Sequence, residues 1–199
     1  MARYQYRDRF YRQAAERGWP SRAAFKLEEL LERFKLIGQG ARVVDLGSAP
    51  GGWLAILSRK VGQEGRVVGI DLVPCVASTA NTITLVGDVR DQALHRRTAQ
   101  ALGSPADLLT SDLAPKLSGI AERDQAKSLE LIEAALAFGR SVLKPGGAMV
   151  AKVFMGSEFE EARRLFTHDF VKVSVVRTRA SRPGSSELYF VARELQKIH

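Results

Sequence analysis

Short apolar segments alternate with longer amphipathic segments along most of this 199-residue chain. The apolar segments have the composition of buried strands, and the amphipathic ones have helical spacing. The strand candidates are Arg42–Leu46, Arg66–Asp71, Thr82–Val86, Ala106–Ser111, Ala148–Val153, Phe170–Val176 and Leu188–Ala192. The helix candidates are a segment from a capping residue at Ser21 to Phe34, then segments near Trp53–Val61, Gln92–Leu102, Arg123–Leu143 and Ser157–Phe166. This alternation predicts an α/β protein with helices packed on a largely parallel sheet.

The carboxyl-terminal part of the pattern differs, because no helix separates the last two strand candidates. Two consecutive strands without a crossover helix are expected to pair antiparallel. Before the fifth strand, the sequence LKPGG (residues 143–147) predicts a helix end and a tight turn. Five strand–helix units and a final antiparallel pair predict a doubly wound, mostly parallel, seven-stranded sheet with one reversed strand near an edge. Ligands of such sheets bind beyond the carboxyl ends of the strands, where the strand order reverses.

The amino-terminal segment is the most basic part of a chain whose net charge is +8. Residues 1–26 contain seven Lys and Arg residues, two acidic residues and six of the 15 aromatic residues. Clustered arginines with interleaved aromatic rings neutralise phosphates and stack on bases, which favours binding to nucleic acid. The alternative is a solvated basic helix whose aromatic side chains pack on the domain. We expect residues 1–20 to form an arm that contacts RNA, and residues 21–199 to form a single domain.

The composition disfavours several kinds of site and location. The chain has one cysteine, Cys75, which excludes an internal disulfide and suits a reducing compartment. Its three histidines are scattered without metal-ligand spacing, so we expect no metal site. The basic amino terminus lacks the apolar core of a secretory signal, and no apolar run is long enough to span a membrane. We therefore expect a cytoplasmic protein without a membrane segment.

A glycine-rich sequence, VVDLGSAPGGW (residues 43–53), links the first strand candidate to the next helix. It lacks the second glycine of the dinucleotide fingerprint G-x-G-x-x-G, and Trp53 stands where a P-loop has its lysine. Close backbone approach without a phosphate cradle suits a ligand with an adenosine but no phosphates, such as S-adenosylmethionine. A tight structural turn is the alternative, because glycine permits one. Gly51 and Trp53 are the predicted cofactor contacts within this loop.

Two acidic residues follow the second and third strand candidates. Asp71 ends the second strand, 20 residues after Gly51, where a carboxylate accepts hydrogen bonds from ribose hydroxyls. Asp88 follows the third strand and is placed to accept a hydrogen bond from the adenine amino group. Taken singly, such residues are more often strand-end or helix-capping acids. Together with the glycine-rich loop, they predict a ring of contacts around an adenosine.

Two further charged residues stand at the ends of the fourth and fifth strand candidates. Asp112 directly follows the fourth strand, and Lys152 lies in the apolar sequence AMVAKVF (residues 148–154). A lysine in such a strand is unusual, because burial of its ammonium group is costly without a partner or a function. The alternative is a lysine whose charged head reaches solvent at the sheet edge.

The chain resembles the FtsJ-type ribose 2'-O-methyltransferases of large-subunit ribosomal RNA over residues 21–192. The matching segments are SRAAFKL (21–27), VDLGSAPGGW (44–53), SDLAP (111–115), KVF (152–154) and SSELY (185–189). The resemblance implies a Rossmann-like class I methyltransferase fold, S-adenosyl-L-methionine as cofactor, and a catalytic tetrad at Lys26, Asp112, Lys152 and Glu187. Asp112 also faces the methyl donor in this assignment. Lys116 departs from the family pattern, which commonly has asparagine there, and this bears on the substrate contacts of the loop.

The resemblance also implies a substrate, namely a uridine in the A-loop of 23S ribosomal RNA within the large ribosomal subunit, and a monomeric enzyme. Another RNA, such as tRNA or a cap, is the alternative substrate, and a non-catalytic RNA-binding module is the alternative class of protein. Such a module has no reason to keep the tetrad together with the cofactor acids. A base N-methyltransferase is disfavoured, because the fourth strand ends in DLAP rather than in a [DN]-P-P-[YF] motif.

The tetrad residues suit methyl transfer from a sulfonium to a ribose hydroxyl, which is a poor nucleophile until it loses its proton. We expect Lys152, as the neutral amine, to accept this proton. The two carboxylates then orient the lysines, and Lys26 positions the ribose or a phosphate. A nearby cation such as Lys26 favours the neutral amine of Lys152, whereas the two carboxylates favour its ammonium form. The sequence does not show which protonation state of Lys152 prevails.

Overall fold

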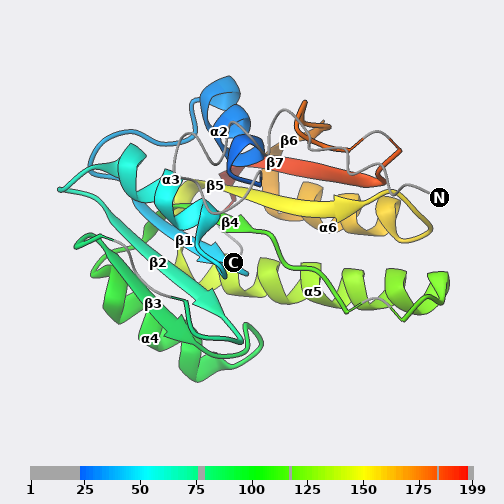
Figure 1. The fold of residues 1–199 in the computed structure, drawn as a ribbon, viewed down its shortest axis with the longest axis horizontal. Coiled ribbons are helices and arrows are strands. Elements are labelled where there is room, and N and C mark those ends of the chain that lie inside the picture. Colours follow the sequence, from blue (N-terminus) through cyan, green and yellow to red (C-terminus); the bar gives the residue numbers. More distant parts are fainter. Residues whose placement is uncertain (1–22, 76–78, 117, 183, 197–199) are drawn as a thin grey trace, which may run out of the picture.

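The computed structural model describes residues 23–75, 79–116, 118–182 and 184–196 of the chain. Its seven strands form one sheet in the order β3-β2-β1-β4-β5-β7-β6, drawn as arrows in Figure 1. The strands are β1 (Arg42–Leu46), β2 (Arg66–Asp71), β3 (Thr82–Val86), β4 (Ala106–Ser111), β5 (Leu143–Phe154), β6 (Phe170–Val176) and β7 (Glu187–Leu195). All seven predicted strands are present. The predicted arm at residues 1–20 lies outside the described residues.

The reversed strand of the sheet is β7. It lies between β5 and β6 and pairs antiparallel with both, whereas the other neighbouring strands pair parallel. The predicted antiparallel pair near one edge is therefore confirmed. The strand order reverses between β1 and β4, which places the switch point beside the glycine-rich loop.

Five described helices cover the two faces of the sheet: α2 (Ala23–Phe34), α3 (Gly52–Val61), α4 (Gln92–Leu102), α5 (Ala121–Val142) and α6 (Phe159–Asp169) (Figure 1). Successive strand residues point to opposite faces, so each strand contributes to two apolar clusters. Val43 and Leu108 pack in the cluster that includes α2 and α3. Val44 and Leu109 pack in the cluster that includes α4, α5 and α6. This two-sided burial explains why the central strands are almost continuously apolar.

Two expectations about the connections are wrong. The helix end predicted at LKPGG is confirmed, because α5 ends at Val142, but the segment does not precede the fifth strand, because Leu143 already pairs with Ala106 as part of β5. The next pair joins Ala148 to Leu108, so the extra residues form an irregularity inside the strand, where Gly146 has a φ of +76°. In addition, the described residues between β2 and β3 form no helix, so β2 does not begin a strand–helix unit.

The topology collects chemically useful residues at one edge of the sheet. The strands β1 to β5 run parallel, so their carboxyl ends lie at the same edge. Because β7 runs the other way, it begins at this edge, and its first residue, Glu187, pairs with Phe154 at the end of β5. None of the described helices is long and apolar enough to cross a membrane.

Candidate active site

A cavity of about 300 Å³ lies beyond the carboxyl ends of β1, β2, β3 and β4. Three predicted cofactor residues, Asp71, Asp88 and Asp112, line it together with Gly47 and Ala49 of the glycine-rich loop. Its apolar lining is contributed by Ile70, Leu72, Val89, Leu113, Ala114 and Leu131. An apolar cavity with a few convergent polar groups is the usual form of a small-molecule site.

At Gly47 the glycine-rich loop passes closest to the end of β4. A Cβ at this position would lie 3.2 Å from the backbone carbon of Asp112 and from the nitrogen of Leu113, and the φ of +76° is strained for other residues. The N–H of Gly47 donates to the carbonyl oxygen of Ile70 at 2.8 Å, which holds the loop against β2. The positive φ favours glycine here, and a Cβ would also crowd the backbone at the end of β4.

Asp71 connects the glycine-rich loop to the loop that follows β2. Its Oδ2 accepts a hydrogen bond from the N–H of Ala49 at 2.9 Å, and its Oδ1 accepts one from the N–H of Val73 at 3.1 Å. Carboxylate oxygens have further lone pairs, so these bonds leave acceptor capacity toward the cavity. The side chain can shape the cavity and accept hydrogen bonds from a ligand at the same time.

Asp88 is held as an ionised acceptor by Arg90. The Nε and the backbone N–H of Arg90 donate to Oδ1 of Asp88 at 2.9 and 3.0 Å. The side-chain bond and then the backbone bond lower the pKa of Asp88 to about 2. A carboxylate in this state suits a ligand that presents an N–H donor, such as an exocyclic amino group.

The other two predicted cofactor residues do not line the cavity. Gly51 precedes α3 with a φ of +105°, and the thiol of Cys75 lies 3.4 Å from where its Cβ would be. Trp53 is 4% exposed, and its indole N–H donates to the carbonyl oxygen of Ala23 at 2.9 Å. Its ring also packs against that of Tyr189, with the centroids 6.1 Å apart. The indole thus joins α3 to α2.

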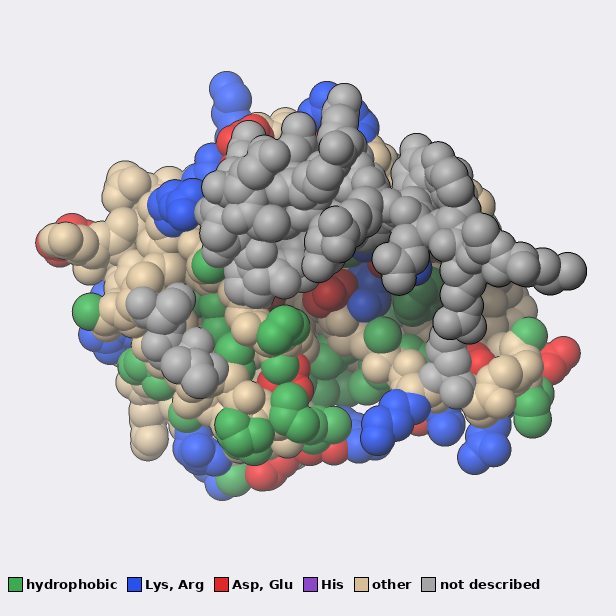
Figure 2. All heavy atoms as spheres, in the orientation of Figure 1, with side chains coloured by type: hydrophobic (Ala, Val, Ile, Leu, Met, Phe, Trp, Pro, Cys, Tyr) green, Lys and Arg blue, Asp and Glu red, His purple; other side chains and the backbone are tan. Residues whose placement is uncertain are grey.

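The four predicted tetrad residues come together as two ion pairs, contributed by α2, the loop after β4, β5 and β7. Lys26 donates to Glu187. The Nζ of Lys152 lies 3.0 Å from Oδ1 of Asp112 and donates to its backbone carbonyl oxygen at 2.8 Å. In the centre of the face drawn in Figure 2, acidic and basic side chains lie together in a hollow beside hydrophobic ones.

Burial governs the electrostatics of the tetrad. The side chains of Lys26 and Lys152 are only 10% and 9% exposed, so each depends on its carboxylate partner. Burial raises the pKa of the Asp112 carboxyl, although the charges of Lys152 and Lys26 oppose this rise and that of Glu187 adds to it. All four groups therefore act on one another, and their formal charges balance.

Two residues of the site were missed from sequence. Tyr189 is buried beneath the tetrad, with the Nζ of Lys26 5.9 Å from its ring centroid, and burial raises the pKa of its hydroxyl well above the usual value. Its position two residues after Glu187, on the same face of a strand, was the available signal. Asp45, at the end of β1, is fully buried, and Thr110 donates to its Oδ1 at 2.7 Å.

Asp112 belongs to both parts of the site, because it lines the cavity and pairs with Lys152. This places a candidate proton acceptor directly beside a candidate small-molecule site. Among the described residues, no group of His, Cys, Asp and Glu is arranged to hold a metal ion. The arrangement suits transfer of a group from a bound small molecule to a hydroxyl acceptor.

Comparison with known proteins gives a family for the chain. A family model described as FtsJ-like methyltransferase matches residues 19–195. A protein from Acidithiobacillus ferrooxidans named ribosomal RNA large subunit methyltransferase E is 42% identical over 193 residues, which cover 97% of this chain and 88% of that protein. Proteins of the same name from Syntrophobacter fumaroxidans and Methanothrix thermoacetophila are each 40% identical over 98% of this chain, covering 98% and 75% of their own lengths.

Solved structures show the same fold. A Plasmodium falciparum protein assigned as a ribosomal RNA methyltransferase aligns with a TM-score of 0.79 and 23% identity, covering 89% of this chain and 98% of that one. Aeropyrum pernix fibrillarin, solved with S-adenosyl-L-methionine bound, aligns with a TM-score of 0.58 and 18% identity, covering 85% and 73% of the two chains. At these identities the similarity establishes the Rossmann-like fold.

Proposed function

The chain belongs to the FtsJ-like methyltransferase family, and on that premise we propose that it methylates a ribose 2'-hydroxyl of large-subunit ribosomal RNA with S-adenosylmethionine. The observation that carries this proposal is the double position of Asp112, which lines the cavity and pairs with Lys152. A methyl donor in the cavity and an acceptor hydroxyl beside Lys152 would then meet at one carboxylate. Alignment of a methyl donor with its acceptor hydroxyl lowers the activation barrier of the transfer by several kcal/mol, about 7 kcal/mol in well-oriented reactions.

The cavity residues fit S-adenosylmethionine, and the cofactor role of Gly51, Trp53, Asp71, Asp88 and Asp112 is part of the proposal. Asp71 would accept hydrogen bonds from the ribose hydroxyls of the cofactor, and Asp88 from its adenine amino group. Gly47 lines the cavity, and its lack of a Cβ lets the loop lie against the end of β4 beside the ligand. When bound, the cofactor supplies an electrophilic methyl group on a sulfonium. Gly51 and Trp53 act through the path of the loop and the anchoring of α3.

Lys152 is the proposed general base. A neutral amine has two N–H groups and one lone pair. Its N–H groups can donate to the carbonyl oxygen and to Oδ1 of Asp112, which lie 2.8 and 3.0 Å from Nζ. The lone pair is then free to take the proton of the ribose hydroxyl while that oxygen attacks the methyl group. Asp112 is thus the positioning group for the base.

The pair of Lys26 and Glu187 lies on the acceptor side of the tetrad. Neither residue lines the cofactor cavity. Glu187 begins β7, which pairs with β5 on the side away from β4, and Lys26 pairs with Glu187 from α2. We assign Lys26 to the ribose or an adjacent phosphate, and Glu187 to the orientation of Lys26. These roles leave the proton transfer itself to Lys152.

The finer substrate assignment is a uridine in the A-loop of 23S ribosomal RNA, within the large ribosomal subunit. The relatives named ribosomal RNA large subunit methyltransferase E support the subunit. The basic aromatic arm at residues 1–20 is proposed to contact this RNA, and we propose a monomeric, cytoplasmic enzyme. With little surface available for base recognition, RNA shape should matter more than local sequence.

The test is transfer of labelled methyl groups from S-adenosylmethionine to undermethylated large subunits, followed by mapping of the product. We expect one position in the RNA to become resistant to alkaline cleavage, because methylation removes the 2'-hydroxyl that attacks the backbone. Label on a base, or on protein alone, would contradict the proposal. Label on tRNA or a cap but not on the subunit would support the alternative substrate. RNA binding without methyl transfer would favour a non-catalytic RNA-binding module.

A further inference from the structure

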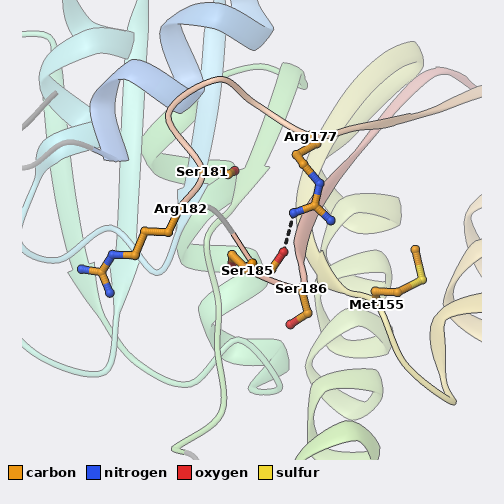
Figure 3. Close-up of a pocket in the computed structure, with 7 residues that line it drawn as sticks. Met155, Arg177, Ser181, Arg182, Ser185 and Ser186 are labelled. Carbon is orange, nitrogen blue, oxygen red and sulfur yellow. Dashed lines mark hydrogen bonds between the residues drawn. The ribbon is translucent and has the colours of Figure 1, made fainter. Parts of the chain in front are cut away.

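The connection between β6 and β7 forms a second cavity, of about 600 Å³, which is separate from the cofactor cavity. Figure 3 shows the residues around it, which are Met155, Arg177, Ser181, Arg182, Gly184, Ser185 and Ser186. The N–H of Met155 donates to the carbonyl oxygen of Ser186 at 2.8 Å, and Ser186 directly precedes Glu187. This cavity therefore adjoins the acceptor side of the tetrad.

The wall of this cavity is cationic. Residues 177–186 contain three arginines and no acidic residue, and none of the described residues that line the cavity is acidic. Arg179 is turned toward α2, where its backbone N–H donates to Glu29 at 2.9 Å. The exposed Arg177 donates one N–H to the carbonyl oxygen of Ser185, drawn as the dashed line in Figure 3. A guanidinium group has five N–H donors, so most of them remain available to a ligand.

A hydrophobic side chain lies beside this charge. Met155 follows the end of β5, lines the cavity and is 50% exposed, so its thioether is accessible to a ligand. A flexible thioether makes favourable contacts with the faces and edges of aromatic rings. The guanidinium group of Arg177 can bind a phosphate, and the thioether of Met155 can contact a base. Together they suit the two chemical parts of a nucleotide.

We propose that this cavity binds a nucleotide next to the one that is methylated, with Arg177 on its phosphate and Met155 against its base. The inference rests on the proposed methylation of RNA ribose and adds a contact outside the tetrad. Ser186 lines the cavity and directly precedes Glu187, so a polynucleotide whose target ribose reaches Lys152 can continue past Glu187 into the cavity. Arg177 and Met155 are thus proposed to hold the strand that presents the target ribose.

The test compares Arg177→Ala, Arg177→Lys and Met155→Ala with a matched control, Arg97→Ala. Arg97 is exposed on α4, which packs on β2 and α5, and it lines neither cavity, so the control removes the same charge outside the two sites. For each variant, KM and kcat are measured with undermethylated large subunits at several salt concentrations. Affinity for S-adenosylmethionine is measured by calorimetry, and folding by circular dichroism.

We expect Arg177→Ala to raise KM about tenfold, with kcat and cofactor affinity unchanged. The salt dependence of RNA affinity should also weaken, its log–log slope falling by about 1, because one phosphate contact is lost. Arg177→Lys should keep the slope. Met155→Ala should raise KM without changing the slope, and Arg97→Ala should change neither quantity.

The outcomes separate this inference from the proposed function. If Arg177 only holds the loop, Arg177→Ala will lower kcat through a displaced Glu187 and leave the salt slope at the wild-type value, which overturns the inference. Wild-type KM and slope in both Arg177→Ala and Met155→Ala would overturn it as well. If Arg177→Ala fails to fold, the KM of Met155→Ala tests the inference: a raised KM supports it, and a wild-type KM overturns it. Absence of ribose methylation by the wild-type protein would instead contradict the proposed function.

Discussion

Lys152 illustrates how a buried cation can be kept for chemistry. Its side chain is 9% exposed and contacts Asp112 through two oxygens, yet it does not line the cofactor cavity. We expect Lys152→Ala to lower kcat by about 10² or more, the range of general-base catalysis, and to leave cofactor affinity nearly unchanged. Single-turnover methyl transfer and calorimetry measure the two quantities. Near-normal turnover in this variant would eliminate Lys152 as the base.

Asp45 gives stability a pH dependence of its own. Burial raises its pKa to about 8, with the hydrogen bond from Thr110 opposing the rise and the charges of Asp112 and Asp71 adding to it. Between about pH 4 and pH 8 the folded protein keeps this proton and the unfolded chain releases it, so the group's contribution to stability falls as pH rises. We expect the free energy of unfolding to fall less between pH 5 and pH 8 in Asp45→Asn than in wild type.

Urea denaturation across this pH range measures the effect, with Asp124→Asn as the control. The backbone and side-chain hydrogen bonds from Ser118 lower the pKa of Asp124, so this group is ionised in both states over the same range. The control should therefore shift stability by the same amount at every pH. Parallel pH curves for wild type and Asp45→Asn would show that Asp45 does not titrate as described.

At the scale of elements, the contact between α2 and α3 determines where Lys26 lies. The indole N–H of Trp53 donates to the carbonyl oxygen of Ala23, at the start of the helix that carries Lys26. We expect Trp53→Phe to lower the free energy of unfolding by about 2 kcal/mol or more, because one hydrogen bond is lost and the smaller ring leaves a cavity in the core. Methyl transfer should fall more than cofactor affinity, measured by denaturation, kinetics and calorimetry. The opposite order would favour the direct cofactor contact that the loop sequence predicts for Trp53.

The bounds of elements that are marked by neighbouring residues could be predicted from the sequence. Contacts between distant elements were harder to predict. The strands β1 to β4 and the helix α4 have the predicted bounds, because apolar runs, caps and glycines mark them in the sequence. The start of β5 was missed, since its first residue pairs with distant Ala106. The hydrogen bond from the indole of Trp53 to α2 was not predicted, because the loop sequence does not show which helix face meets α2. Which lysine pairs with which acid likewise depends on the β5–β7 pairing and on the docking of α2.

At the scale of the whole molecule, the sheet separates two binding functions and joins them at the tetrad. The parallel strands end in the cofactor cavity, whereas the reversed strand β7 and the loop before it form the acceptor side. One reversed strand is what allows Glu187 to stand at the same edge as Asp112. An all-parallel sheet would place the start of that strand at the opposite edge, away from the chemistry.

This separation predicts how the whole protein responds to small ligands. A ligand that binds only the folded state raises stability, by about 2.7 kcal/mol at a hundred times its Kd. We expect S-adenosylmethionine to raise the Tm and NAD to leave it unchanged, because the glycine-rich loop lacks a pyrophosphate cradle. Lys152→Ala should keep the Tm shift, since Lys152 lies outside the cavity, and Asp71→Ala should lose most of it. An equal shift with NAD would contradict the cofactor assignment. A shift lost in Lys152→Ala would mean that donor and acceptor sites are not separate.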